Sequence, residues 1–114
     1  MRRPRVSSEV PAAADPAEEQ AERIASAVIA VDGVAGLHAG MFGEVATYLP
    51  GRRVAGIRVG PDRVDVHVSL ALDAPVRPTA TAIQRVVAAI TDLPVDVTVE
   101  DLVPVTPASG RELR

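Results

Sequence analysis

The chain has 114 residues, which is room for one domain, and 47% of them are hydrophobic, which is enough for a core. Its net charge of −3 and its single Phe and single Tyr argue against a nucleic-acid partner, because such surfaces need cations and stacking rings. The lack of cysteine excludes disulfides, thiolate zinc sites and cysteine nucleophiles.

Residues 1–14 are rich in Pro, Ser, Ala and Arg, and we expect them to form a disordered tail. This segment has a basic start but lacks the apolar stretch of a secretory signal. No run of about 18 apolar residues occurs in the chain, so we expect no membrane-spanning helix. The sequence therefore predicts a cytoplasmic protein, unless another molecule recruits it to a membrane.

A single domain is predicted for residues 15–103, and it opens with a helix. Asp15 and Pro16 form the start, because an acidic N-cap is followed by proline at the first helical position. Gly33 ends the helix at the left-handed cap position. The apolar residues between these ends recur at helical spacing: Ala17, Ala21, Ile24, Val28 and Val31.

Three short strands are predicted next, at residues 34–38, 44–49 and 54–59. A glycine-rich loop at residues 40–43 separates the first two, and a Pro-Gly turn at residues 50–51 separates the second from the third. Gly56 weakens the middle of the third strand. A turn at residues 60–62 then closes a hairpin onto the strand that follows.

The stretch at residues 64–72, VDVHVSLAL, is the clearest structural signal in the chain. Valine or leucine occupies every second position, which is typical of a strand with one dry face and one wet face. A proline-broken connection at residues 73–78 leads to a second predicted helix at residues 80–91. The strand at residues 95–102 repeats the alternation, and we expect residues 104–114 to be a disordered C-terminal tail.

These elements predict an α+β fold, with two helices on one face of a small, mostly antiparallel sheet, in the order α-β-(β)-β-β-α-β. The last strand–helix–strand unit should make a right-handed crossover. If the last strand passes to the far side of the strand 54–59, the strand 54–59 lies in the middle of the sheet. The uncovered face would then meet water or a partner. It would show these polar side chains: Arg58, Asp65, His67, Asp96, Thr98 and Glu100.

The polar face contains the ligand-type residues that could converge, namely Asp65, His67, Asp96 and Glu100. One histidine with scattered carboxylates suits neither a zinc site nor a compact oxygen cage. Asp65, His67 and Ser69 do not form a catalytic triad, because alternate side chains on one strand stand about 6.6 Å apart. We therefore expect no catalytic residues, no bound metal and no cofactor.

The segment at residues 41–53, MFGEVATYLPGRR, is the strongest candidate for contact with a partner. It contains both aromatic residues and an arginine pair, and Tyr and Arg are enriched among residues that anchor interfaces. The sequence leaves two roles open, since Phe42 and Tyr48 either fill the core or lie on a contact surface. The candidate contact residues are Met41, Phe42, Tyr48, Arg52, Arg53 and Arg58.

The order of these motifs resembles the alkaline shock protein family, the envelope stress response family of Gram-positive bacteria. The resemblance covers about residues 20–102. It is carried by the VDGVAG stretch after the first helix (31–36), GEVATYLPGRRVAGIRV (43–59), the alternating strand 64–72, and the segments 86–90 and 95–100. Two connections depart from the family pattern, because the segments 73–78 and 91–94 lack its usual glycine-bearing turns.

The resemblance implies a cytoplasmic protein that works by assembly. Some family members collect at the inner face of the cell membrane through a membrane-anchored partner and support cell-envelope homeostasis. The family has no established catalytic residues, so none are carried over. We therefore predict a non-enzymatic interaction protein of the envelope stress response, which associates with itself, with a paralogous chain or with a membrane-anchored protein.

Two other classes of function stay open at this point. A small RNA- or ligand-binding module would fit the helix–strand–strand–helix–strand order, but the chain lacks the basic face of such domains. An enzyme is the least favoured class, because no nucleophile–base pair or ligand set passes the geometric test.

Overall fold

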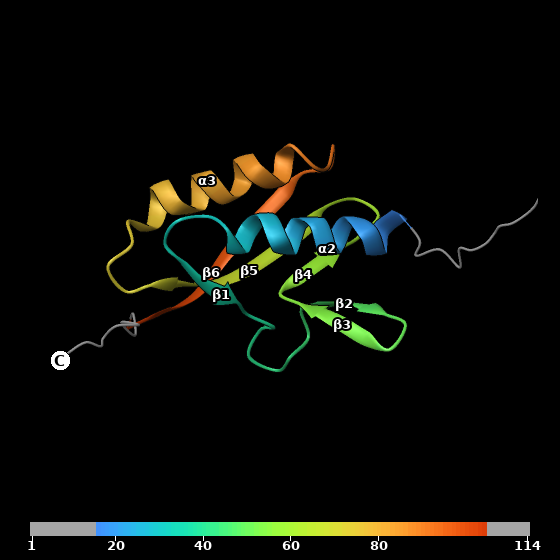
Figure 1. Ribbon diagram of the computed structural model, residues 1–114, viewed down its shortest axis with the longest axis horizontal. Coiled ribbons are helices and arrows are strands. Elements are labelled where there is room, and N and C mark those ends of the chain that lie inside the picture. Colours follow the sequence, from blue (N-terminus) through green and yellow to red (C-terminus); the bar gives the residue numbers. More distant parts are fainter. Residues whose placement is uncertain (1–15, 105–114) are drawn as a thin grey trace, which may run out of the picture.

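Strand β5 (Val64–Ala71) is the centre of the fold in the computed structural model, which describes residues 16–104 (Figure 1). The side chains on one face of β5 are completely buried, and those on the other face are partly exposed. The alternation in the sequence therefore predicts the buried face correctly, because successive side chains of a strand point to opposite faces. The buried side chains are Val64, Val66, Val68 and Leu70.

Three strands pair with β5, two along one edge and one along the other. Strands β1 (Val34–Leu37) and β4 (Ile57–Val59) run antiparallel to β5 and share an edge, β1 beside its C-terminal half and β4 beside its N-terminal half. Strand β6 (Val95–Val103) runs parallel along the opposite edge. The possibility that the strand 54–59 is central is therefore wrong. The crossover places β6 directly beside the strand that precedes it, as most sequential strands are placed.

Both helices cover the face of the sheet that carries the buried side chains of β5 (Figure 1). Helix α2 (Pro16–Ile29) packs on β1 and β4, and helix α3 (Val76–Ala88) packs on β6. The predicted α+β fold is thus confirmed. Among the described residues, no helix combines the length and the apolar character needed to cross a membrane. The hydrophobic side chains that the helices bury completely are Ala21, Ile24, Val28, Ile83 and Val87.

Helix α3 begins earlier than predicted. The proline-broken connection predicted at residues 73–78 is wrong in its second half, because the helix starts at Val76. Pro75 precedes the helix in an extended conformation (φ −73°, ψ 115°). Pro78 then lies in the first turn, where backbone N–H groups have no partner inside the helix, so proline removes nothing that the helix needs.

The strand predicted at residues 54–59 is interrupted at Gly56. Its first part belongs to β3 (Arg52–Ala55), which pairs with β2 (Ala46–Leu49) in a separate two-stranded hairpin. Its second part is β4, in the main sheet. Gly56 has a φ of +85°, in the left-handed region that favours glycine, so the chain turns there from one sheet into the other.

The predicted N-terminal tail at residues 1–14 and residues 105–114 of the predicted C-terminal tail lie outside the described residues.

Candidate functional site

The face of the sheet away from the helices carries polar side chains from β4, β5 and β6. The predicted polar face is therefore present, and ionisable side chains of neighbouring segments pair with one another on it. Thr98, also predicted on this face, is exposed and lies opposite His67 in the register of β5 and β6. The side-chain pairs are Arg58 with Asp65 (3.4 Å), Arg63 with Asp96 (2.6 Å) and His67 with Glu100 (2.5 Å).

A β-bulge in β6 positions Glu100. The register between β5 and β6 shifts after Val68, so that Ser69 lies opposite Asp101 and Glu100 is the extra residue. The carboxylate of Glu100 contacts Nδ1 of His67, and both side chains are mostly buried, at 23% and 17% exposure. Because of the bulge, the successive carboxylates of Glu100 and Asp101 both lie beside the polar face. In a regular strand, two successive side chains would point to opposite faces.

The four ligand-type residues predicted from the sequence share this face but do not converge. Asp65 and Asp96 are each engaged by an arginine, whereas His67 and Glu100 contact each other. Within residues 16–104, no three histidine or carboxylate side chains come together as a group that could hold a metal ion.

The loop between β1 and β2 presents Met41 and Phe42 at its tip. Their side chains are 82% and 87% exposed, the highest values among the large hydrophobic residues that the structure describes. The backbone of the loop is held by local hydrogen bonds. The N–H of Gly40 donates to Nδ1 of His38 at 2.9 Å, and the N–H of Phe42 donates to Oε1 of Glu44 at 3.0 Å. The loop therefore holds two large apolar side chains in solvent.

The two aromatic residues do not fill the core. Phe42 lies at the loop tip, and Tyr48, on β2, is 68% exposed. The largest fully buried side chains are isoleucine, leucine and valine, led by Ile24, Ile57 and Leu70. Of the two roles that the sequence left open, core filling is therefore excluded by the structure.

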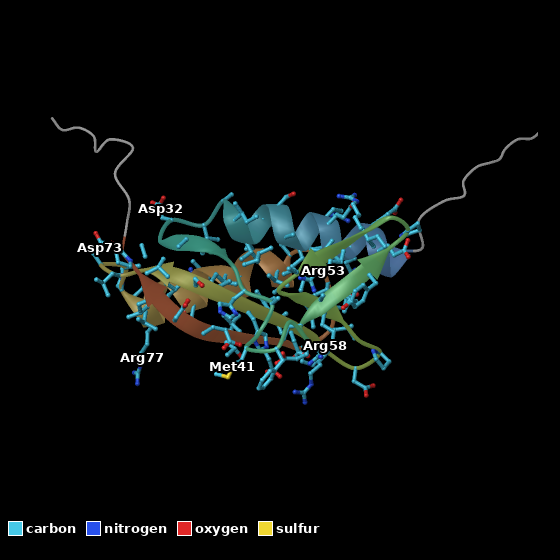
Figure 2. The ribbon with its side chains drawn as sticks, turned by 90° about the horizontal axis from the view of Figure 1, so that it is seen from below. Asp32, Met41, Arg53, Arg58, Asp73 and Arg77 are labelled. Atoms are coloured by element: carbon cyan, nitrogen blue, oxygen red, sulfur yellow. The ribbon has the colours of Figure 1, made fainter. Side chains whose placement is uncertain are left out.

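Two arginines lie at the base of the loop. Nη1 of Arg53, on β3, donates to the carbonyl oxygen of Gly43, and Nη1 of Arg58, on β4, donates to that of Glu44, each at 3.5 Å. Met41, Arg53 and Arg58 are labelled in Figure 2. All six predicted contact residues are exposed, and we call them the loop–hairpin surface: Met41, Phe42, Tyr48, Arg52, Arg53 and Arg58.

The pKa of Glu44 is lowered from its ordinary value of 4.5. The first cause is a hydrogen bond from its own backbone N–H, followed by that of Phe42, with smaller electrostatic contributions from His67 and Arg58. Because the pKa is lower in the folded chain, the ionised carboxylate stabilises the fold at any pH above the unfolded-state pKa. This stabilisation is lost as the pH falls through the folded-state pKa. An NMR titration should therefore give Glu44 a lower midpoint in the folded chain than in urea. Equal midpoints would contradict this account of the loop.

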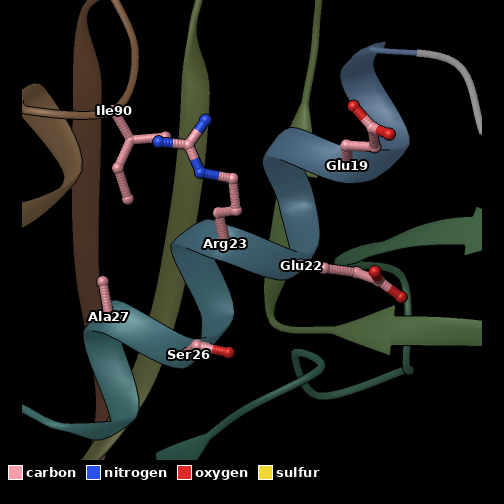
Figure 3. Close-up of a pocket in the computed structure, with 6 residues that line it drawn as sticks. All are labelled: Glu19, Glu22, Arg23, Ser26, Ala27 and Ile90. Atoms are coloured by element: carbon pink, nitrogen blue, oxygen red, sulfur yellow. The ribbon is translucent and has the colours of Figure 1, made fainter.

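A shallow hollow of about 660 Å³ lies on the helix side of the fold, between α2 and Ile90 (Figure 3). The guanidinium of Arg23 points toward Ile90, whereas the carboxylates of Glu19 and Glu22 point to the other side. Glu22 is also paired with Arg52 of the hairpin. The hollow therefore lacks a set of converging polar groups. Its lining residues are Glu19, Glu22, Arg23, Ser26, Ala27 and Ile90.

The sequence contains the string Gly-x-x-Gly twice, at residues 33–36 and 40–43. In some RNA-binding domains such a string clamps the nucleic-acid backbone. The first string runs from the turn after α2 into β1, and the second holds the exposed loop tip. Neither has a cation between its glycines, and Glu44 follows the second, so neither brings the positive charge that phosphate groups attract.

Comparisons of the chain with protein-family models, with curated proteins and with solved structures find no match. The resemblance to the alkaline shock protein family therefore rests on the order of its sequence motifs.

Proposed function

We propose that this chain is a non-enzymatic interaction protein that acts by self-association, with the loop–hairpin surface as one side of the contact. The observation that carries the proposal is the exposure of Met41 and Phe42, at 82% and 87%, on a loop whose backbone is hydrogen-bonded. Contiguous large apolar side chains held in solvent are typical of interaction sites.

The residues around the loop tip support the same proposal. Tyr48 lies opposite Arg53 in the hairpin register, and both side chains are exposed. Aromatic and arginine side chains dominate the binding energy of protein interfaces, because they combine large contact areas with polar groups that fix the geometry. The loop–hairpin surface therefore has the composition of an interface centre, with apolar anchors flanked by cations.

The resemblance extends the proposal to a cellular role. The chain would be a cytoplasmic member of the envelope stress response family, recruited to the inner face of the membrane by a membrane-anchored protein or a paralogous chain. The order of motifs over about residues 20–102 supports this role. The non-enzymatic character is supported by the polar face, where the ionisable side chains are paired with one another on an open sheet surface.

We expect the double substitution Met41→Ser and Phe42→Ser to weaken self-association at least about tenfold, which corresponds to about 1.4 kcal/mol. The reason is that the two most exposed apolar anchors lose the area that a partner would remove from water. Light scattering coupled to size-exclusion chromatography, over a range of protein concentrations, measures the association. The free energy of unfolding should change by less than about 0.5 kcal/mol, because neither side chain lies in the core.

A matched control is Ile29→Ser, which removes a 57% exposed hydrophobic side chain from the end of α2. This variant should associate like the wild-type chain, because Ile29 is not part of the loop–hairpin surface. A wild-type chain that stays monomeric at every concentration would refute self-association. A double variant that assembles as well as the wild type would exclude the loop tip from the contact.

A further inference from the structure

Strand β6 forms an open edge of the main sheet. It is nine residues long and, among the described strands, pairs only with β5. An edge strand presents a row of unpaired backbone N–H and C=O groups, which can pair with a strand of another molecule. The length of β6 makes this row long enough to accept a complete strand of ordinary length.

Strand β6 is also acidic, with three carboxylates and no basic residue. Asp96 and Asp101 are exposed, and the bulge adds Glu100 beside Asp101. Two copies of β6 that paired with each other would bring carboxylates together, which is destabilising. The edge therefore discriminates against a second β6 and favours a strand that carries positive charge.

Strand β3 is the strand of opposite charge. Among the described strands it alone contains two arginines, Arg52 and Arg53, and it pairs only with β2. Successive side chains of a strand point to opposite faces. Arg52 is paired with Glu22 of α2, so Arg53, on the opposite face of β3, is the arginine that would lie on the carboxylate face of β6. Strands β4 and β5 stand between the hairpin and β6, so this pairing requires a second copy of the chain (Figure 1).

We propose that the open edge of β3 in one copy pairs with the open edge of β6 in a second copy. This inference rests on the proposed self-association and names the two elements that meet. Backbone hydrogen bonds supply the contact, and Arg53 of β3 facing Asp101 of β6 supplies the specificity. Arg53 also contacts the loop at Gly43, so Met41 and Phe42 lie beside the joint.

The joint is heterologous, because it uses two different edges. After a single contact one copy keeps a free β6 and the other keeps a free β3, so further copies add at both ends and assembly continues as a ring or a filament. This property separates the proposed joint from a symmetric dimer through one patch, in which both surfaces are used up at once.

Charge reversal tests the joint. Arg53→Glu and Asp101→Arg should each weaken self-association at least about tenfold, because each places like charges across the joint. The variant with both substitutions should associate to within about threefold of the wild type, since it restores opposite charges. Sedimentation velocity of the full chain measures all three. Both residues are exposed, and circular dichroism with urea unfolding verifies that each variant is folded.

Mixing the two single variants gives a second test. The mixture contains two charge-matched joints. One joins β3 of the Arg53→Glu variant to β6 of the Asp101→Arg variant, and the other joins the unchanged β3 of the Asp101→Arg variant to the unchanged β6 of the Arg53→Glu variant. We expect the mixture to regain self-association to within about threefold of the wild type, because copies of the two variants that alternate oppose unlike charges at every joint. A mixture that assembles no better than the separate variants would overturn the joint. Hydrogen exchange adds a readout specific to strand pairing, since outward backbone amides of β6 should exchange more slowly in the wild-type assembly than in the Arg53→Glu variant.

The control is Arg85→Glu, which makes the same charge change at an exposed arginine of α3 and should leave assembly unchanged. If the wild type assembles and the reversals have no effect, or the double variant is not restored, this inference is overturned while the proposed function stands. If the Asp101→Arg variant does not fold, hydrogen exchange provides the test. Equal exchange rates of the β6 amides in the wild type and in the Arg53→Glu variant would also overturn this inference. A wild-type chain that is monomeric overturns both.

Discussion

Replacing Gly56 with alanine should lower the free energy of unfolding by about 3 kcal/mol. Gly56 has a φ of +85°, and a Cβ built there would lie 2.8 Å from Cβ of Leu37 and 2.9 Å from the carbonyl oxygen of His67. The neighbours are the backbone of β5 and the root of a side chain on β1, so neither can move without displacing the sheet. Urea unfolding followed by circular dichroism measures the loss.

The matched control is Gly51→Ala. Gly51 also has a positive φ, of +79°, but a Cβ there would meet nothing within 4 Å. This variant should lose only about 1 kcal/mol, from the backbone conformation alone. The difference between the two variants isolates the steric part of the loss at Gly56. Equal losses would show that the junction between the hairpin and the main sheet has room for a side chain.

The regular elements are predictable because their patterns are local. In β5, Asp65 stands between Val64 and Val66, and the alternation by itself assigns the buried face. In α2, the spacing of Ala21, Ile24 and Val28 does the same with the helical period. Strands β1, β2 and β6 begin and end within two residues of their predicted bounds.

The breaks between elements are less predictable, because they depend on residues far away in the sequence. The pattern shows that Gly56 weakens a strand, but only the approach of Leu37 and His67 shows that the chain must turn there. Its N–H donates to the carbonyl of Val45 at 2.8 Å, and its own carbonyl accepts from the N–H of His67 at 2.8 Å. These two hydrogen bonds join three segments of the chain. Neither bond can be predicted from the pattern of residues within the strand alone.

The candidate site shows the same division. Its residue types were evident, because both aromatic residues and an arginine pair lie in residues 41–53. Whether Phe42 is buried was not evident, because a phenylalanine beside a methionine has the same pattern in a core and on a surface. The hydrogen bond from the N–H of Phe42 to Glu44 holds the loop in the conformation that exposes both side chains. The pairing of His67 with Glu100 was also hidden, since it requires the bulge in β6.

Replacing Leu70 with alanine should destabilise the fold by about 3 to 4 kcal/mol. Leu70 is completely buried on the helix face of β5, with Val34 of β1 opposite it on one side and Leu102 of β6 on the other. The substitution therefore removes buried methyl groups where three strands meet, and the surrounding backbone cannot collapse fully into the space. A lower urea midpoint at an unchanged slope measures this loss as a change in stability.

The matched control is Leu72→Ala, two residues further along the same alternation. In the sequence, Leu72 is the fifth member of the apolar series, but β5 ends at Ala71 and Leu72 is 58% exposed. The control deletes the same atoms and should cost less than about 1 kcal/mol, because those atoms remain largely in water in the folded state. The ratio of the two losses therefore locates the end of the core. Similar losses would mean that the apolar series is buried throughout its length, and that the boundary at Leu70 is misplaced.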